Sequence, residues 1–462
     1  MFENIIAQAA AEQLQKDILS RRLAPSMLFF GPEASGKGSA AIELARTLSC
    51  ENNSAVTPAP WNCGCSGCAR HRMLVHPDLA MLGSRNFPAE ISASRAAFLR
   101  DTSSAAGRSL FTRSLRKLMA RFSPAVWEYE SKSGRLNPLP LLQSLEDDLD
   151  ELELLASGSG DVKPLSLEKL TDSLVKNAFK LEDEGVSESV PIAQVRKAAD
   201  WSRLAPTGKR KVLIIENADR MKDEARNSLL KLLEEPPETI SIVLTARRRE
   251  TVLPTILSRL RPYRFLVRSA SQEREIIRRI FRDSAAAEEK ETEQEGTLGD
   301  TKSDAGSGLV KSYLDSFLPQ PPEKLLPLAA FFAAAVSRSA AALAKSRSAQ
   351  ISPALQATGG YCAPVAEAAG LERTADAGET VAVLISQSRN FEGRSFSRFL
   401  SLVSDLVSRS LRQCAPDPGL IVCGNIWRKR LAEAQSANGI WNQRPELALE
   451  SLFVRLREDL AA

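Results

Sequence analysis

The segment from Gly31 to Ser39 could bind phosphate. It reads GPEASGKGS and fits the pattern G-x-x-x-x-G-K at Gly31, Gly36 and Lys37. In such a loop, backbone N–H groups and the N-terminus of the next helix surround the phosphates, while the lysine reaches the outer oxygens. The pattern normally continues with Ser or Thr, whose hydroxyl holds Mg²⁺, but this chain has Gly38. Ser39 cannot replace that hydroxyl, because one further helical residue turns a side chain by about 100°.

Two polar residues after the apolar segment 212–215 could complete an ATP site. An ATPase needs two acids there, one in the shell of Mg²⁺ and one that activates the attacking water. Glu216 fits the first role, but Asn217 stands in the place of the second, and an amide cannot accept a proton. The sequence therefore predicts a phosphate loop that does not hydrolyse ATP. It leaves open whether ATP or ADP still binds, and whether the loop is only a tight turn.

Four of the seven cysteines could bind a metal ion. Cys50, Cys63, Cys65 and Cys68 would close a tetrahedral Zn²⁺ site, which is structural rather than catalytic. The Cys63 to Cys65 step is one residue tighter than C-x-x-C, so His71 could take the place of Cys63. The alternative is a group of four reduced, buried thiols. The other three cysteines are expected in the core: Cys362, Cys414 and Cys423.

Length and composition limit the class of protein. A chain of 462 residues, 43% hydrophobic and 26% charged, predicts a globular protein of about three domains. The net charge of +4 excludes a polycation that binds nucleic acid through its tails. The longest apolar run, Leu325 to Val336, is shorter than the roughly 20 residues of a membrane helix, so a buried helix is expected. We expect a cytoplasmic protein without a secretion signal or membrane anchor.

The elements that position the candidate residues form an α/β pattern. Apolar segments at 27–30, 212–215 and 240–244 predict strands, and helical patterns at 5–21, 39–49 and 223–235 alternate with them. Continuous apolar strands between helices indicate a parallel sheet covered on both faces. The glycine-rich loop lies at a strand-to-helix junction, which is the context that a phosphate loop requires.

The segment from Phe87 to Pro191 lacks this alternation. It contains a basic amphipathic helix near 110–122 and an acidic one near 142–152. We expect the two to pair as a hairpin through their opposite charges, and the alternative is two independent solvated helices. After an acidic, Gly/Ser-containing linker at 288–308, the chain is expected to be helical throughout.

Several segments together resemble a known family. They are FENIIAQ near residue 2, RLAPSMLFFGP before the glycine-rich loop, HPD after the cysteines, KVLIIENADRM, NSLLKLLEEPPETISIVLTA and TILSRLR. This combination resembles the bacterial DNA polymerase III clamp-loader subunits of the AAA+ superfamily. The resemblance covers roughly 1–85 and 190–265, and the segment from 87 to 190 looks like an insertion.

The resemblance also implies a role. In this family the gamma and tau subunits carry the hydroxyl and the acid pair, whereas the delta-prime subunit lacks them. Gly38 and Asn217 therefore make the chain similar to delta-prime, as does the C-terminal segment ANGIWNQRPELALESLFVRLRE. That type implies a non-hydrolysing, DNA-associated subunit that assembles with gamma/tau and delta and helps to load the sliding clamp onto primer-template DNA.

Two more site residues follow from the resemblance. Ser258 and Arg259 match the Ser-Arg-Cys motif of the family, with Leu260 in place of the cysteine. This match implies that Arg259 acts in trans as an arginine finger on ATP bound to a neighbouring subunit. A surface arginine that caps the preceding helix is the alternative. Thr245 matches the position that senses the γ-phosphate, and the alternative is a strand-end Thr that satisfies backbone groups.

The expected organisation follows from these assignments. An AAA+ domain at 1–265 would hold the zinc loop at about 50–70 and the insertion at about 87–190. A helical lid at 266–345 would include the acidic linker, and a helical collar at 346–462 would drive oligomerisation. Two competing functions remain, which are an ATP-hydrolysing subunit of the gamma/tau type and a nucleotide-sensing AAA+ scaffold outside replication.

Overall fold

The structure, a computed structural model, separates into two units, Met1–Leu318 and Pro319–Ala462. Each unit is described by itself. The structure describes residues 1–52, 59–83, 87–127, 137–157, 164–187, 189–292, 308–318, 322–348, 352–387, 395–413, 418–441 and 444–461. Cys414 and most of the expected acidic linker, at 293–307, therefore lie outside the described residues.

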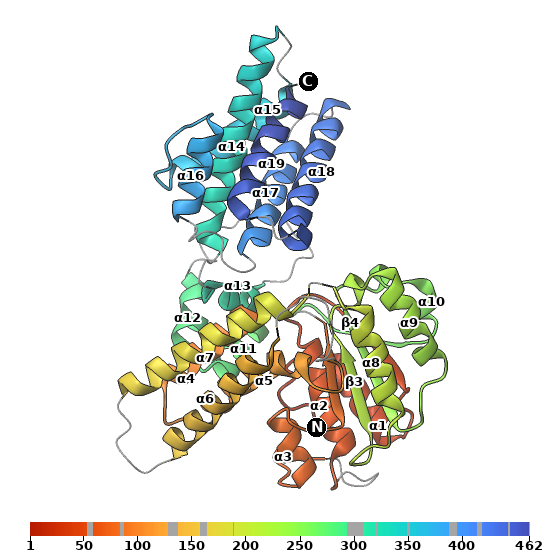
Figure 1. Ribbon diagram of the computed structural model, residues 1–462. Coiled ribbons are helices and arrows are strands. Elements are labelled where there is room, and N and C mark those ends of the chain that lie inside the picture. Colours follow the sequence, from red (N-terminus) through yellow and green to blue (C-terminus); the bar gives the residue numbers. More distant parts are fainter. Residues whose placement is uncertain are drawn as a thin grey trace. The chain divides into compact units, whose positions relative to one another are not determined.

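A five-stranded sheet forms the centre of the first unit (Figure 1). Its order is β2-β3-β4-β1-β5, and all neighbouring strands run parallel. The three strands predicted from apolar segments, β1, β3 and β4, are confirmed, whereas the short strands β2 and β5 were not predicted. The bounds are β1 Ser26–Phe30, β2 Leu79–Leu82, β3 Lys211–Ile215, β4 Ile240–Ala246 and β5 Arg261–Arg264.

Helices cover both faces of this sheet, because successive side chains of a strand point to opposite faces. Met27 and Phe29 of β1 pack in one apolar cluster with helices α1 and α2, whereas Leu28 packs in another with α8 and α9. The expected α/β fold is therefore confirmed. The helices have the bounds α1 Ala9–Leu19, α2 Lys37–Ser49, α8 Ile192–Arg203 and α9 Asp223–Glu234.

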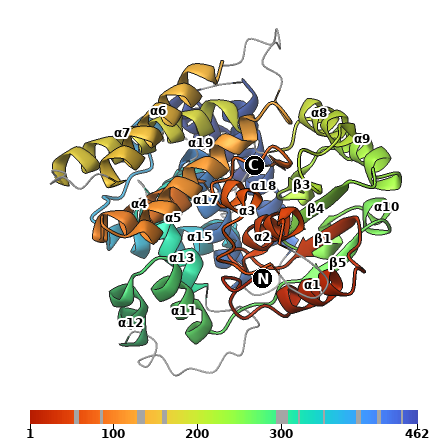
Figure 2. The same cartoon turned by 90° about the horizontal axis from the view of Figure 1, so that it is seen from below.

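Four helices fill the segment between β2 and α8. Helix α5 packs along α4 and α6 along α7, and the four share one apolar cluster (Figure 2). Acidic α6 and basic α5 therefore belong to the same core, as amphipathic helices do. The bounds are α4 Phe87–Arg100, α5 Ala105–Met119, α6 Leu139–Ser157 and α7 Pro164–Gly185.

The charge pairing that we expected between the basic and the acidic helix is wrong. Among the described residues, the ion pair between α5 and α6 is Arg108–Glu153 at 3.4 Å. The other basic side chains of α5 contact the end of α3, Ser66–Arg72, and α4 instead. Arg113 donates to the carbonyl of Arg72, Arg116 to the carbonyl of Met73, and Lys117 pairs with Glu90.

Three helices after the sheet pack together, and one of them, α13, packs against α4. Their apolar residues form a cluster that includes Ala93 of α4, and Figure 2 shows α13 beside α4. Arg100 of α4 donates to the carbonyl of Phe281 (2.7 Å) and lies 3.1 Å from a carboxylate oxygen of Asp283. The bounds are α11 Ala270–Ile280, α12 Ser284–Thr292 and α13 Leu309–Ser316.

The second unit is helical in the part that the structure describes. Its apolar cluster contains residues of α14 through α19, with Phe332 between Phe399 and Phe453. We expected α14 in the lid. It belongs to the second unit instead, where it packs with α15, α17 and α19. The bounds are α14 Pro322–Ser346, α15 Pro353–Glu367, α16 Ala377–Gln387, α17 Ser395–Arg412, α18 Pro418–Trp441 and α19 Pro445–Leu460.

One helix among the described residues, α14, is long and apolar enough to cross a membrane by length and composition alone. The segment is Leu325–Ser346, with a mean hydropathy of 1.5, and 72% of its most apolar window is buried inside the fold. Leu325 and Val336 belong to the apolar cluster of the second unit. The expected buried helix is therefore confirmed.

Candidate functional site

The phosphate loop joins β1 to α2 and depends on two glycines. Gly31 has φ +150°, and a Cβ there would lie 2.2 Å from the carbonyl oxygen of Phe265. Gly36 has φ +93° and immediately precedes α2. Glycine adopts such conformations without steric cost, which explains why both ends of the loop carry glycine.

Lys37 binds its own loop in this structure. Its Nζ donates to the carbonyls of Gly31 (2.7 Å) and Pro32, and to the hydroxyl of Ser35 (3.2 Å). Burial lowers the pKa of Lys37 to about 8, although Glu33 and Glu216 oppose this shift. A phosphate that binds here must therefore compete with carbonyl groups of the loop for the ammonium.

The first turn of α2 offers no buried hydroxyl to a metal ion. Gly38 has no side chain, and Ser39 is exposed. Buried Arg268 stabilises the loop, because it donates to the carbonyl of Ala34 in the loop (2.9 Å) and to the carbonyl of Ile6 (2.9 Å). Sequence reasoning missed Arg268, because a single arginine after a strand carries no motif.

Glu216, the candidate Mg²⁺ acid, is occupied by an arginine. It is buried at the end of β3 and forms an ion pair with the guanidinium of Arg121. Arg121 comes from the turn Ala120–Phe122 after α5, its side chain is 3% exposed, and its Nε donates to the carbonyl of Gly83 (2.9 Å). The carboxylate that a metal ion would need is therefore neutralised by the protein itself.

The ends of β2 and β3 approach closely at this ion pair. Gly83 has φ +90°, and a Cβ there would lie 2.1 Å from the carbonyl oxygen of Glu216. No other residue type fits that approach without a backbone shift. Gly83 thus allows one guanidinium to reach both strand ends.

Asn217 and Thr245 contact each other through a backbone group. The N–H of Asn217 donates to the hydroxyl of Thr245 at 3.1 Å, and Thr245 is buried. Asn217 adopts the left-handed conformation, with φ 52° and ψ 52°. The Thr245 hydroxyl, which was expected to sense phosphate, accepts a hydrogen bond from the backbone at the end of the neighbouring strand β3. This contact fits the alternative, in which Thr245 is a strand-end residue that satisfies backbone groups.

Arg259 lies on the surface after the short helix α10, Pro254–Leu257. Its guanidinium donates to Glu234 at the end of α9 (2.8 Å) and to the carbonyl of Thr255 (2.5 Å). It is thus held by its own chain, as the capping alternative expects, while its side chain remains 33% exposed. The adjacent Leu260 is buried in the apolar cluster under α9, which accounts for an apolar residue in place of the family's cysteine.

The four cysteines come together as predicted. Their sulfur atoms all lie within 4.8 Å of one another, with Cys50 3.7 Å from Cys63 and 4.0 Å from Cys65. A tetrahedral zinc site with Zn–S bonds of about 2.3 Å has S–S edges of about 3.8 Å, so the group has the size of a Zn²⁺ site. Cys63 lies in the group, whereas His71 stacks on His76, with ring centres 4.1 Å apart.

Two polar side chains donate hydrogen bonds to the sulfur atoms. Arg46 donates to Cys68 (2.9 Å) and Asn52 to Cys63 (3.3 Å), as outer-shell groups of thiolate ligands do. A hydrogen bond from the backbone of Cys65 lowers the pKa of Cys63 to about 6, and burial raises the pKa of Cys68. All four thiols are free of disulfides. The residues fit a structural zinc ion.

Cys362 and Cys423 are buried in the second unit, as predicted.

The HPD segment, His76-Pro77-Asp78, has a structural role. Asp78 accepts from the backbone N–H groups of Thr207 (2.9 Å) and Gly208 (2.6 Å), which fixes the turn before β3.

Comparison with known proteins identifies the family. The family described as "DNA polymerase III, delta subunit" matches residues 6–131 and 161–268, together about half of the chain. The match extends into the segment expected to be an insertion and leaves only 132–160 between its two parts.

Individual relatives match shorter stretches. The DNA polymerase III subunit delta' of Pseudomonas aeruginosa is 38% identical over 82 residues, which is 18% of this chain and 25% of that protein. The gamma/tau subunits of Mycobacterium bovis and Mycobacterium tuberculosis are 33% identical over 90 residues, which is 19% of this chain and 16% of theirs. The matched segment thus spans a quarter or less of these relatives.

A solved structure also matches at low similarity. It is a DNA polymerase III gamma subunit-related protein from Thermotoga maritima, 18% identical, with a TM-score of 0.27, and the match covers 63% of this chain and 90% of that one. At this score the likeness carries no argument about the fold. The parallel sheet, the phosphate loop and the family match together give the first unit an α/β AAA+ fold, followed by a helical C-terminal region. The chain therefore belongs to the family of DNA polymerase III clamp-loader subunits of the delta-prime and gamma type.

Proposed function

We propose that this chain is a delta-prime-type clamp-loader subunit that does not hydrolyse ATP. The observation that carries the proposal is the buried ion pair between Arg121 and Glu216. A carboxylate that already neutralises a guanidinium is a poor ligand for Mg²⁺, because binding the metal would leave the arginine buried without its partner. Gly38 and Asn217 remove the remaining metal and water contacts.

The proposed contribution of the chain is then made at a subunit boundary. Arg259 would leave Glu234 and donate to the γ-phosphate of ATP bound by a neighbouring gamma/tau subunit. The partial exposure of its side chain supports this movement, since the surface ion pair with Glu234 contributes only about 0–1 kcal/mol. Thr245 has no separate role in this proposal.

The partners proposed for the chain are gamma/tau and delta subunits, the sliding clamp and primer-template DNA within the complex. The helices after the sheet would act as the lid and the second unit as the collar. The proposed place of action is the cytoplasm. A structural Zn²⁺ on Cys50, Cys63, Cys65 and Cys68 would stabilise the loop that packs on α2.

A reconstitution experiment tests this proposal. The purified chain is mixed with gamma/tau, delta and the clamp of the same source, and the DNA-stimulated ATPase rate is compared with and without the chain. The proposal predicts one complex on size-exclusion chromatography, and a rate that depends on the chain. Failure to join the complex would contradict a clamp-loader role.

The ATP-hydrolysing alternative has one observation in its favour. The mycobacterial gamma/tau subunits match almost as well as the delta' subunit, at 33% against 38% identity. Hydrolysis of ATP by the purified chain without other subunits would support this alternative. A scaffold outside replication would neither hydrolyse ATP nor join the complex.

A further inference from the structure

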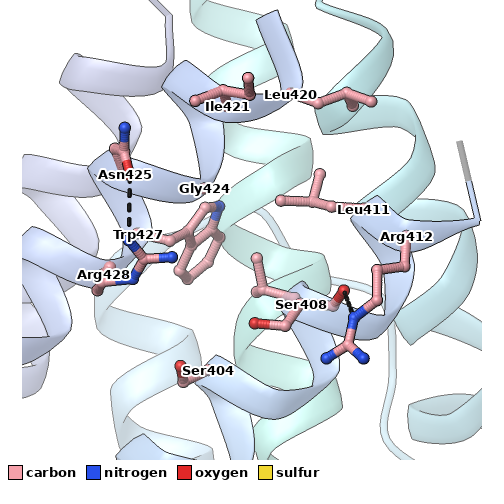
Figure 3. A pocket seen from close by; sticks show the side chains of 11 residues that line it. Ser404, Ser408, Leu411, Arg412, Leu420, Ile421, Gly424, Asn425, Trp427 and Arg428 are labelled. Atoms are coloured by element: carbon pink, nitrogen blue, oxygen red, sulfur yellow. Dashed lines mark hydrogen bonds between the residues drawn. The ribbon is translucent and has the colours of Figure 1, made fainter. Parts of the chain in front are cut away.

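The second unit contains a pocket between two of its helices. It has a volume of about 370 Å³ and lies between α17 and α18 (Figure 3). Leu411, Leu420 and the ring of Trp427 provide much of its apolar lining. The volume is at the small end of ligand pockets and suits one large side chain with its flanking main chain.

The mouth of the pocket carries exposed apolar side chains. Ile421, which lines the pocket, is 70% exposed, and the adjacent Val422 is 60% exposed. Large apolar groups that are this exposed beside a pocket are typical of an interaction surface. Their position at the start of α18 places them next to the apolar lining.

The charge around the pocket has one sign. Arg412 and Arg428 both line it, and no Asp or Glu is among its described lining residues. Arg412 donates its Nε to the carbonyl of Ser408 (3.2 Å), and Arg428 donates Nη1 to Asn425 (3.2 Å), as Figure 3 shows. Each exposed guanidinium therefore keeps N–H groups that are available for an anion.

The floor of the pocket holds a buried donor. Trp427 is 1% exposed, and its Nε1 has no acceptor among the residues that the structure describes. In Figure 3 the ring nitrogen points toward the side of the pocket where Leu411 and Leu420 lie. A buried N–H without an acceptor is costly, so this group points to a ligand that supplies an oxygen.

We propose that this pocket binds a short acidic peptide segment of a partner protein. An aliphatic or aromatic side chain of the peptide packs on Trp427, Leu411 and Ile421. Carboxylates next to that anchor pair with Arg412 and Arg428, and a main-chain carbonyl accepts from Nε1 of Trp427. The combination of an apolar floor with two cations at the rim selects a peptide that is both acidic and apolar.

Fluorescence anisotropy of the full chain tests the proposal. The probe is the fluorescein-labelled hexapeptide DEDLFL, with NQNLFL as its uncharged twin, at about 0.15 M salt to screen distant charges. We expect DEDLFL to bind at least about 10-fold more tightly than NQNLFL, because each charged hydrogen bond contributes that much to affinity.

Variants locate the site. Arg412→Glu and Arg428→Glu should each weaken binding about 10-fold or more, and Trp427→Phe, which keeps the ring but removes the donor, about 3-fold to 10-fold. Arg409→Glu is the matched control, because Arg409 is an exposed arginine of α17 that does not line the pocket. Its affinity should stay within about 2-fold of the parent, because its side chain does not line the pocket.

Three results would overturn the proposal. One is equal binding of the two peptides, and another is parent-like binding by both pocket arginine variants. The third is loss of peptide binding when gamma/tau and delta subunits are added, because the pocket would then be covered by a neighbouring subunit. The surface variants Arg412→Glu and Arg428→Glu keep the test decisive even if Trp427→Phe does not fold.

Discussion

The two ligand sites that the sequence predicts differ in what their key groups contact. In the phosphate site, Lys37 binds its own loop and Glu216 pairs with Arg121, so internal partners occupy the groups that would bind ATP and Mg²⁺. In the cysteine site, the sulfurs face one another at the spacing of a zinc tetrahedron. A motif in a sequence therefore shows that ligand groups are present, whereas only the structure shows whether they are available.

The largest expected effect is the loss of zinc from the cysteine site. Cys68→Ala should lower the zinc content from about one per chain to well below one, and should lower the free energy of unfolding by several kcal/mol, because metal binding there is coupled to folding. Plasma emission spectrometry and urea denaturation measure the two. Cys362→Ala is the control that should keep the metal, and a parent protein that lacks zinc as purified would contradict the site.

Breaking the ion pair of the phosphate site should have the next largest effect. Arg121→Met removes the guanidinium that pairs with the buried Glu216 and should lower the free energy of unfolding by about 3–5 kcal/mol. The double variant Arg121→Met/Glu216→Gln should recover most of that loss. Urea denaturation of both variants measures the coupling. Equal stability of the parent and the single variant would show that the pair does not hold the site closed.

The proposed role of Arg259 at a subunit boundary gives the next prediction. Arg259→Ala should lower the DNA-stimulated ATPase rate of a reconstituted loader by about 10-fold or more, because a planar cation on the γ-phosphate is lost. Glu234→Gln, which frees Arg259 without removing it, should leave the rate unchanged or higher. If Arg259 only caps α10, its removal would alter stability by a few tenths of a kcal/mol and leave the rate as it was.

The smallest effect concerns the ammonium of Lys37. With a pKa of about 8, it loses its proton as the pH rises through 8, whereas lysines of ordinary pKa remain charged to about pH 10. Competitive acetylation followed by mass spectrometry across pH 6 to 11 should therefore give Lys37 a labelling midpoint near pH 8, about two pH units below that of ordinary exposed lysines. A midpoint for Lys37 near pH 10 would contradict the lowered pKa.

Local patterns explain why much of the fold was predictable. The strands β1, β3 and β4 are apolar runs next to glycine, acidic or proline residues, and the loop after β1 has a fixed spacing of glycines. The four cysteines lie within 19 residues of chain, so their assembly follows from their spacing. Strand β5 reads RPYR and carries no such pattern.

The partner of Glu216 could not be predicted for a physical reason. Arg121 lies 95 residues earlier, in a basic amphipathic segment. The charged side chains of such a segment are normally expected to face solvent. Its burial depends on the close approach of Gly83 to the end of β3, which only the tertiary structure reveals. The same holds for Arg268 under the phosphate loop.

A steady-state ATPase assay on the purified full chain shows whether its own phosphate site is inactive. We expect phosphate release with Mg²⁺ and ATP, with or without primed DNA, to equal that of the Lys37→Ala variant. Phosphate release that is well above this variant, and that disappears with Lys37, would contradict the claim that the chain's own groups keep the site inactive.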